Sequence, residues 1–351
     1  MRSRKLFAFV LAIIILSIFI SGCESNNNKE PLSKTEFLMD TVINLKIYDK
    51  QDKKALDEAI DRLKEIESRM SSHIESSDVR QINDNAGIKP VKVHDDVYHV
   101  IEQAKHFAEI SHGAYEPTIG PLVDLWNITG IDEKERDSIP TEEEIKEKLE
   151  LVDYNDLEIM EDNKIYLNRK GMKLDLGGIA KGYAADEVKR IFKEHGINSA
   201  IIDLGGNVYA LGNKANDESW RIGIQDPFDI TGNYLGILNV KDKSIVTSGD
   251  YERYFKYKGK KYHHIIDSKT GYPSENEVAG ISIISDKSID GDALSTALFV
   301  LGIEDGIQLL NQLENVEGIF IDKKEEVIIP KILEKDFTLE NENLKLIINS
   351  H

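Results

Sequence analysis

Hydrophobic and polar positions divide the first third of the chain into extended and helical segments. Residues 36–48 alternate apolar and polar side chains after Asp40, which predicts a β-strand. Residues 52–70 carry apolar side chains at helical spacing, and so do residues 95–111. Both of these segments are therefore predicted to form amphipathic helices.

The rest of the chain alternates short predicted strands with a few helices. The predicted strands are 157–160, 164–168, 172–176, 200–204, 207–211, 220–225, 236–240, 244–247 and 279–285. The predicted helices are 141–151, opened by a capping box of Thr141 and Glu144, then 179–195, 291–301 and 305–313. The predicted hairpins are 251–257 with 261–266, turning at Lys258-Gly259, and 318–322 with 326–329.

This pattern predicts an α+β fold in which mixed β-sheets are flanked by helices. No Pro/Ser-rich linker interrupts residues 36–330, so these residues are predicted to form one domain. Residues 331–351 then form an acidic C-terminal tail whose role the sequence leaves open.

The first 23 residues differ from the rest of the chain. A basic start precedes an uncharged run of fifteen residues at 6–20, which is shorter than the ~20 residues of a membrane-spanning helix and typical of a secretory signal. Ser21-Gly22-Cys23 then resembles a bacterial lipobox, although an ordinary signal peptide or membrane anchor with a nearby cysteine is the alternative. We expect a signal peptide over residues 1–22, lipid on Cys23, a flexible tether over residues 23–35, and a location on the extracytoplasmic face of the cell membrane.

Composition narrows the classes of function. The 351 residues include 44 Lys and Arg against 63 Asp and Glu, a net charge of −19, and removal of residues 1–22 lowers it to −22. Such an acidic chain is not suited to bind nucleic acid or an anionic bilayer through general electrostatics. Cys23 is the single cysteine, which excludes an internal disulfide and metal sites built from cysteine clusters.

Two segments have the residues of a phosphate and metal site. Residues 173–183 run from a predicted strand through Gly177-Gly178 into a helix with Lys181 in its first turn, a pattern that favours an anion, with a simple tight turn as the alternative. Asp292 and Thr296 are four residues apart and project from one helix face. A carboxylate and a hydroxyl can bind Mg²⁺, but an aspartate near a helix N-terminus can also serve the helix alone.

Two other segments are candidates for catalysis and ring binding. His264 ends a predicted strand and Asp267 follows it, which is typical of a general base with a carboxylate that orients it, or of a surface strand that enters a turn. Residues 113–126 contain two prolines and two glycines with aromatic residues nearby, and predict a rigid irregular loop that can hold a planar ring or only connect two elements.

Taken together, these segments resemble the ApbE family of FAD:protein FMN transferases. The matching segments follow the family order and are residues 37–41, 114–126, 175–186, 203–207, 247–251, 264–273 and 292–302. The resemblance implies a Mg²⁺-dependent transfer of FMN from FAD to a threonine hydroxyl of a target protein, with release of AMP. Partners are implied to be threonine-containing proteins of membrane or exported redox systems.

The resemblance also implies roles for individual residues. Asp292, Thr296 and the carbonyl of Gly178 would hold Mg²⁺, and His264 with Asp267 would form the catalytic pair. The FAD-binding set would comprise Met39, His73, Ala114, Tyr115, Glu116, Asp175, Lys181 and Ile266. The family pattern more often has a small residue at Asp40, a tyrosine at His73 and a proline at Ser268.

Two alternatives use the same sequence features. An FAD pyrophosphatase would use the same site with water as the nucleophile and would release free FMN and AMP. A lipid-anchored solute-binding protein would explain the signal and the acidic body, but it has no need of the Asp292/Thr296 pair beside a glycine-rich turn.

Overall fold

The structure is a computed structural model that describes residues 30–214, 217–229 and 232–350. Residues from Leu32 onward belong to one folded unit. The predicted signal peptide and Cys23 lie outside the described residues.

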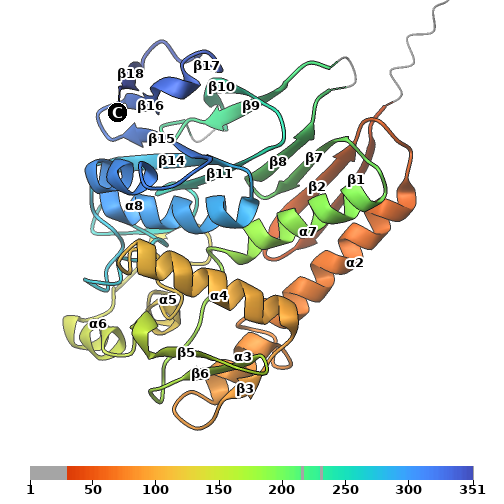
Figure 1. The fold of residues 1–351 in the computed structure, drawn as a ribbon. Coiled ribbons are helices and arrows are strands. Elements are labelled where there is room, and N and C mark those ends of the chain that lie inside the picture. Colours follow the sequence, from red (N-terminus) through yellow and green to blue (C-terminus); the bar gives the residue numbers. More distant parts are fainter. Residues whose placement is uncertain (1–29, 215–216, 230–231, 351) are drawn as a thin grey trace, which may run out of the picture. The chain divides into compact units, whose positions relative to one another are not determined.

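A nine-stranded sheet is the central element of this unit (Figure 1). Its strands in spatial order are β1 (Leu32–Leu38), β2 (Thr41–Ile47), β7 (Ser199–Leu204), β8 (Asn207–Gly212), β11 (Lys243–Gly249), β14 (Val278–Ser285), β15 (Val316–Asp322), β16 (Glu326–Pro330) and β18 (Lys345–Asn349). Neighbouring strands are antiparallel except for the parallel pair of β16 and β18.

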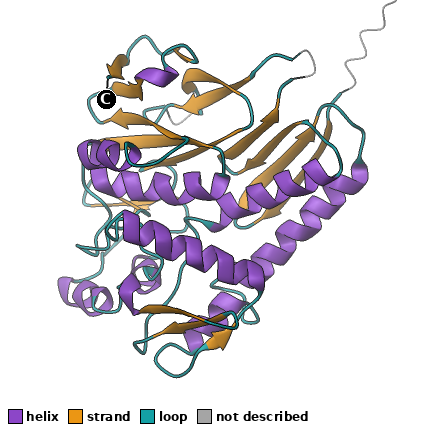
Figure 2. Cartoon of the chain, in the orientation of Figure 1, coloured by secondary structure: helices purple, strands orange, loops and turns teal. Residues whose placement is uncertain are grey.

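Long helices cover one face of this sheet (Figure 2). They are α2 (Lys53–Met70), α7 (Ala180–Glu194) and α8 (Ser288–Leu310), and α4 (Asp95–Ile110) packs on α8. By length and composition α8 is apolar enough to cross a membrane, but its packing against β11, β14 and α4 accounts for that composition. The predicted helices 291–301 and 305–313 are its two parts, which meet at Gly302 with non-helical backbone (φ 83°).

Three small sheets and three short helices complete the unit. The sheets are β17 (Phe337–Leu339), β10 (Tyr234–Val240) and β9 (Trp220–Gln225); β13 (Lys260–His263), β12 (Tyr254–Tyr257) and β4 (Ile131–Glu135); and β3 (Val91–Lys92), β6 (Lys164–Leu167) and β5 (Leu157–Met160). The short helices are α3 (Asp78–Asp84), α5 (Gly120–Trp126) and α6 (Glu142–Leu149), the last with its capping box formed. An apolar cluster that includes Trp220, Ile224 and Phe337 joins β9, β10 and β17 to the main sheet.

The N-terminal boundary of the fold differs from the prediction. The predicted strand 36–48 is a hairpin of β1 and β2, because Met39 and Asp40 both adopt positive φ and reverse the chain. The predicted tether over residues 23–35 ends earlier, since β1 begins at Leu32 and pairs with β2 along its whole length. The polar Ser33-Lys34-Thr35 run conceals this strand in the sequence, because it lies at the edge of the sheet.

Two other predictions are corrected. Residues 172–176 form no strand but a loop held by residues 113–119, with Asp175 N–H donating to the Pro117 carbonyl (2.9 Å). Residues 331–350 of the predicted tail belong to the fold, since β18 extends the main sheet and Phe337 is buried. The single-domain prediction therefore ends too early at residue 330, because pairing between distant strands leaves no local pattern.

Candidate active site

The crossing of α7 and α8 brings the two predicted ligand segments together. A Cβ on Gly182 would lie 2.3 Å from the Ser288 carbonyl oxygen and 2.7 Å from the Asp292 Cβ, so only glycine permits this close approach. The Gly182 N–H donates to Asp292 Oδ2 at 2.8 Å. The predicted phosphate turn and the predicted metal carboxylate therefore share one site, although 110 residues separate them in the chain.

The Gly178 backbone lies beside the Thr296 hydroxyl. A Cβ built on Gly178 would lie 3.2 Å from Thr296 Oγ1 and 3.3 Å from Tyr115 Cε2. Thr296 follows Asp292 by one turn of α8, and Asp292 is buried. The structure thus places the three predicted magnesium ligands, Gly178, Asp292 and Thr296, around one point.

Lys181 completes the polar face of this point. Its Nζ lies 3.6 Å from Asp292 Oδ1 and 3.3 Å from the Gly177 carbonyl oxygen. Lys181 stands in the first turn of α7, whose N-cap residue Ile179 makes no side-chain capping bond. The helix N-terminus and the ammonium group both favour an anionic oxygen at this position.

The Tyr115 hydroxyl is an unsatisfied polar group at the same point. Tyr115 is buried, its hydroxyl oxygen has no hydrogen-bond partner among the described residues, and burial with the charges of Asp292 and Asp175 raises its pKa well above the ordinary value. Buried hydroxyls are nearly always paired. The orphan donor therefore indicates a ligand that supplies an acceptor beside Asp292.

The oxygen donors fit magnesium better than a softer metal. Among the described residues no group of three or more His, Cys, Asp or Glu side chains is arranged to hold a metal ion. Asp292, Thr296 and the Gly178 carbonyl instead offer one carboxylate with neutral oxygens. Mg²⁺ typically takes one or two carboxylates and completes its shell with water and substrate phosphates.

The loop of residues 113–118 forms the neighbouring wall. Ala114 and Tyr115 are buried, and the Glu116 carboxylate accepts hydrogen bonds from the Thr118 N–H (2.8 Å), the Thr118 hydroxyl (2.7 Å) and the Tyr154 N–H (3.0 Å). The Glu116 side chain is thus fully used inside the loop. The Glu116 carboxylate therefore has no free oxygen for a ligand, and only the backbone of residues 114–116 could contact FAD.

Asp175 lies between this loop and α7. Its Oδ1 accepts the Gly177 N–H at 2.7 Å, and its own N–H is held by Pro117. Burial raises the pKa of the Asp175 carboxyl, while the hydrogen bond from the Gly177 N–H acts in the opposite direction. His73, another predicted FAD residue, is exposed to solvent.

His264 is held by a backbone carbonyl and not by Asp267. Its Nδ1 lies 3.3 Å from the Arg253 carbonyl oxygen, which also accepts the His264 N–H at 3.1 Å. Nδ1 therefore carries the proton, and Nε2 keeps its lone pair. Burial, and next the charge of Arg253, lower the pKa of the His264 imidazole to about 3. The ring is neutral at physiological pH and able to accept a proton.

The predicted partner of His264 has a different position. Asp267 Oδ1 accepts the Lys269 N–H at 2.9 Å, and the Asp267 N–H donates to the Tyr272 carbonyl, so this residue closes the turn after His264. The expected Asp267–His264 pair is absent from the hydrogen bonds of the described residues. The short Asp-Ser-Lys turn explains this, because it directs the carboxylate to its own backbone.

Ser268 ties the His264 segment to the wall of the site. Its hydroxyl donates to the Gly113 carbonyl at 2.6 Å, a bond that the proline more frequent at this position cannot make.

Two other predicted FAD residues lie on separate elements. Ile266 forms a β-bridge with Pro273 and is buried in a separate apolar cluster with Trp126. Met39 stands at the β1–β2 turn, where its N–H donates to Glu67 Oε1 (2.7 Å).

Sequence reasoning missed two contributors. The Arg253 carbonyl orients His264, and the neighbouring Glu252 lies near Lys181 and Asp292, whose charges act on the pKa of Glu252 in opposite directions. Both residues directly follow residues 247–251, a segment that resembles the ApbE family, and this position is the only sequence feature that could have pointed to them. The carbonyl of Arg253 could not be predicted from residue type, because every residue has a backbone carbonyl.

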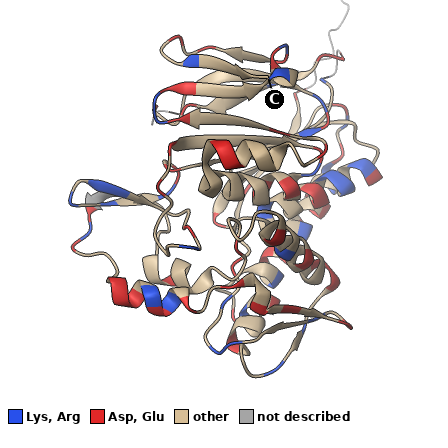
Figure 3. Ribbon diagram, turned by 60° about the vertical axis from the view of Figure 1, so that its left-hand side comes forward, with Lys and Arg blue, Asp and Glu red and all other residues tan. Residues whose placement is uncertain are grey.

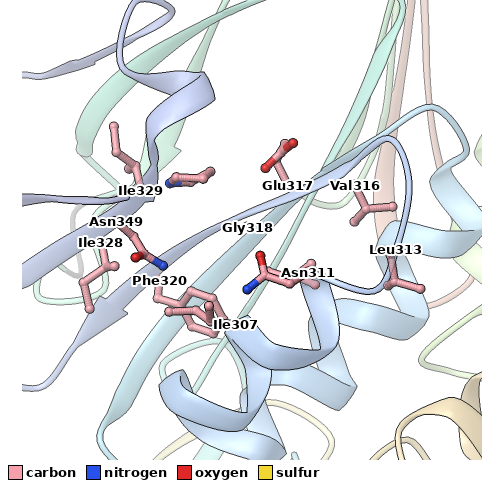
Figure 4. A pocket seen from close by; sticks show the side chains of 12 residues that line it. Ile307, Asn311, Leu313, Val316, Glu317, Gly318, Phe320, Ile328, Ile329 and Asn349 are labelled. Atoms are coloured by element: carbon pink, nitrogen blue, oxygen red, sulfur yellow. The ribbon is translucent and has the colours of Figure 1, made fainter. Parts of the chain in front are cut away.

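A cavity elsewhere contains none of the predicted site residues. It measures about 220 Å³ between the second part of α8, β15 and β16, with Leu310, Phe320 and Ile328 in its lining (Figure 4). Its lining includes Asn311, Glu317 and Asn349 but no cationic side chain. It lacks the groups that a pyrophosphate requires.

Comparison with known proteins gives consistent matches over most of the chain. The family model described as "ApbE family" matches residues 39–320. The chain is 34% identical over 339 residues to the FAD:protein FMN transferase of Treponema pallidum, with 92% of each protein covered. It is 37% identical over 298 residues to the FAD:protein FMN transferase of Klebsiella pneumoniae, with 85% of this chain and 91% of the relative covered.

Solved structures agree with these matches. The crystal structure of the ApbE protein from Thermotoga maritima superposes with a TM-score of 0.79 at 31% identity, over 88% of this chain and 99% of that one. The flavin transferase ApbE from Vibrio cholerae superposes with a TM-score of 0.74 at 29% identity, over 84% of this chain and 94% of that one.

Proposed function

The chain belongs to the ApbE family, and we propose that it transfers FMN from FAD to a threonine hydroxyl of a target protein in a Mg²⁺-dependent reaction that releases AMP. It is a transferase, as its relatives are FAD:protein FMN transferases. The observation that carries the proposal is the meeting of Gly178, Asp292 and Thr296 beside Lys181, which supports a pyrophosphate-binding site.

Asp292, the Thr296 hydroxyl and the Gly178 carbonyl would hold the magnesium ion. When bound, the ion would neutralise charge on the pyrophosphate oxygens of FAD. The protein itself would contribute by holding the Asp292 carboxylate in a fixed position. Because Asp292 Oδ2 is already held by the Gly182 N–H, its Oδ1 remains directed toward Lys181 and the ligand.

Lys181 and the first amides of α7 would bind the phosphate oxygens directly. Phosphoryl transfer depends mainly on alignment and on stabilisation of the charge that develops on those oxygens. Lys181 is held between Asp292 and the Gly177 carbonyl, so its ammonium group needs little reorganisation. This local positive charge offsets the net charge of −22 expected for the mature chain.

His264 would act as the general base. Its Nε2 lone pair accepts the proton of the threonine hydroxyl as the oxygen attacks the phosphorus of the FMN half. The new P–O bond to threonine forms while the bond to the AMP phosphate oxygen breaks, and AMP leaves with that oxygen. The low pKa of His264 keeps the base neutral before the reaction.

We also propose that a lipid on Cys23 holds the enzyme at the extracytoplasmic face of the cell membrane. Support comes from the charged start, the apolar run and the Ser21-Gly22-Cys23 sequence. Residues 24–31 separate Cys23 from the first strand, and even fully extended they span about 30 Å. A lipid on Cys23 would therefore keep the folded unit near membrane-bound acceptors.

The test is to incubate the chain from residue 24 onward with FAD, MgCl₂ and threonine-containing candidate acceptors. We expect AMP by chromatography and an acceptor mass increased by FMN less one water. AMP with free FMN and no adduct would instead support the pyrophosphatase. Asp292→Asn should abolish both products, and the matched control Asp290→Asn, two residues earlier on α8, should keep them.

A further inference from the structure

The N-terminus of α8 is capped by a side chain from another helix. Asp186 of α7 accepts the Ser288 N–H on Oδ1 at 2.9 Å and the Ile289 N–H on Oδ2 at 3.0 Å. These are the first two residues of α8, and the preceding Lys287 makes no side-chain capping bond within the described residues. The first N–H groups of a helix have no partner inside the helix. Asp186 therefore satisfies two donors that the local sequence of α8 leaves open.

An ionised carboxylate suits this position. Negative charge is stabilised by the partial positive charge at a helix N-terminus. Burial raises the pKa of Asp186 to about 6, while the two amide donors act in the opposite direction, so the group is mostly ionised at pH 7.5. Acidic side chains are spread over the helices of this protein (Figure 3). What distinguishes Asp186 is the pair of backbone donors from a second helix.

The cap lies one helical turn from the contact that holds Asp292. Gly182 and Asp186 are four residues apart, so they lie on one face of α7. A Cβ on Gly182 would lie 2.3 Å from the Ser288 carbonyl oxygen, and the Gly182 N–H donates to Asp292 Oδ2 at 2.8 Å. Asp292 follows Ser288 by one turn of α8. One face of α7 thus makes two successive contacts with the first two turns of α8.

Hydroxyl groups hold the side of α8 that faces the sheet. Ser244 Oγ of β11 donates to Ser288 Oγ at 2.8 Å, and Ser248 Oγ of the same strand donates to Ser295 Oγ at 2.9 Å. Ser288 and Ser295 are two turns apart on one face of the helix. These bonds fix α8 on the sheet, whereas its position against α7 is set by the two contacts described above.

Loss of the cap would disturb the predicted metal ligands. A carboxylate with bonds to two successive N–H groups resists both a slide of α8 along its axis and unwinding of its first turn. Without these bonds the two N–H groups would turn to water, and the first turn would fray. Asp292 and Thr296 lie in the next two turns. Their distance from α7 would then no longer be fixed.

We propose that Asp186 is a positioning residue of the magnesium site: by capping α8 from α7, it holds the Asp292 carboxylate and the Thr296 hydroxyl where the ion binds. This inference rests on the proposed function, since it concerns the metal site of that reaction. The alternative is a cap that serves only the stability of α8. The two differ in one measurable respect, because only a positioning cap is energetically coupled to metal binding.

The first test uses the unmodified chain from residue 24 onward at pH 7.5. NMR follows the hydrogen exchange of the Ser288 and Ile289 amides in the presence of ADP, with either MgCl₂ or EDTA. ADP supplies a pyrophosphate but has no FMN to transfer. Coupling is reciprocal, so metal binding must stabilise the cap, and we expect both amides to exchange at least about fivefold more slowly with MgCl₂.

An amide in another capped helix is the control for this measurement. The Glu144 N–H donates to Thr141 Oγ1 at 3.2 Å in the capping box of α6. Its exchange should be the same with MgCl₂ and with EDTA. Equal exchange of the Ser288 and Ile289 amides under the two conditions would overturn the proposal without reference to any variant.

The second test removes one acceptor of the cap. Asp186→Asn keeps the size of the side chain but replaces one carboxylate oxygen with an NH₂ group, which cannot accept an N–H. Thr141→Ala, which removes the cap of α6, is the matched control. Binding of Mn²⁺ in the presence of ADP is measured from the EPR signal of free Mn²⁺, with Mn²⁺ and ADP alone as the blank.

We expect the Kd for Mn²⁺ to rise at least about fivefold in Asp186→Asn and to stay unchanged in Thr141→Ala, although both substitutions lower the urea midpoint. If Asp186→Asn does not fold, Asp186→Glu takes its place, because it keeps the carboxylate but displaces it by one methylene. An unchanged Kd in a folded Asp186 variant with a lowered urea midpoint would make Asp186 a purely structural cap and overturn the proposal.

Gly182→Ala tests the route of the effect. If Asp186 acts through the Gly182–Asp292 contact, the double variant with Asp186→Asn should raise the Kd for Mn²⁺ by less than the product of the two single effects. A double variant that shows the full product would overturn this route, because the two residues would then act independently.

The outcomes also separate this proposal from the proposed function. If the unmodified chain binds no Mn²⁺ in the presence of ADP, the magnesium site fails, and the role of Asp186 fails with it. If Mn²⁺ binding depends on Asp186 but no FMN adduct forms on any acceptor, the flavin transfer fails and the positioning role stands. If adducts form and Mn²⁺ binds equally to the unmodified chain and the folded Asp186 variant, only the positioning role fails.

Discussion

The Asp292 carboxylate is anchored on the backbone of Gly182, whose N–H donates to Oδ2 at 2.8 Å. One oxygen of the carboxylate thus belongs to the contact between two helices, and the other faces Lys181 and the ligand site. The position of the predicted metal ligand therefore depends on how closely α7 and α8 pack.

Gly182→Ala should lower both stability and activity. The added methyl group would meet the Ser288 carbonyl at 2.3 Å, so the helices must separate and the Asp292 bond must lengthen. We expect a loss of about 1–3 kcal/mol in the free energy of unfolding, measured with urea, together with slower AMP release. Gly130→Ala is the control, since no atom lies within 4 Å of its added carbon; equal stability of the two variants would contradict the packing argument.

Asp292→Asn should reduce turnover far more than it reduces stability. The substitution keeps the shape of the side chain but removes the only carboxylate of the proposed magnesium set, so we expect kcat to fall by about a hundredfold or more. EDTA should abolish the activity of the unmodified chain, and MgCl₂ should restore it. Full activity after removal of divalent metal would exclude the magnesium assignment.

His264→Gln should slow transfer without weakening FAD binding. A general base contributes about a hundredfold to ten-thousandfold to a rate, and His264 makes its described bonds to the Arg253 carbonyl and not to the predicted pyrophosphate site. Steady-state kinetics should show a lower kcat with little change in KM for FAD. A parallel loss of FAD affinity would make His264 a binding residue.

His264 should also make the protein less stable in mild acid. Its pKa is about 3 in the folded chain and about 6.5 when unfolded, so only the unfolded chain takes up a proton between these values. Stability must then decrease as the pH falls from about 6.5 toward 3. Urea unfolding at pH 7 and pH 5 should show a decrease about 1–2 kcal/mol larger for the unmodified chain than for His264→Gln. An equal decrease would mean that the His264 pKa is not lowered.

Tyr115→Phe should stabilise the ligand-free protein while it weakens substrate binding. The substitution removes a buried hydroxyl with no partner among the described residues, and an unsatisfied group of this kind costs about 1–3 kcal/mol. Thermal unfolding without FAD should show a higher Tm, and KM for FAD should rise. A lower Tm of the ligand-free variant would show that the hydroxyl already has a partner in the protein.

The elements with strong local signals are those that the sequence predicts well. Residues 52–70 and 95–111 carry amphipathic patterns, and both form helices within a residue of the predicted bounds. The Lys258-Gly259 turn also forms as predicted, because both residues adopt the positive φ that a tight hairpin requires. Two strands that were missed in whole or in part, β18 and β1, lie at the two edges of the main sheet, where one-sided burial leaves only a weak pattern.

In the candidate site, too, the sequence indicates which residue types are present but not where each side chain points. Asp292, Thr296, Gly178 and Lys181 are recognisable by chemistry and spacing, and the fold brings them close to one another. Asp267 has suitable chemistry as well, but its turn directs the carboxylate to the Lys269 N–H. Its expected role passes to the Arg253 carbonyl, which no sequence pattern could indicate, since every residue has one.

The sequence by itself therefore determined the secondary-structure elements with regular periodicity, the family, and the oxygen and nitrogen groups available for the reaction, because these follow from residue type and local spacing. Only the tertiary structure decided which groups meet: the anchoring of Asp292 on Gly182, the orphan Tyr115 hydroxyl among the described residues, and the acceptor that orients His264. The physical reason is that each of these depends on contacts between segments far apart in the chain. Such contacts arise from the packing of whole helices and strands, which the order of side chains in any one segment does not encode.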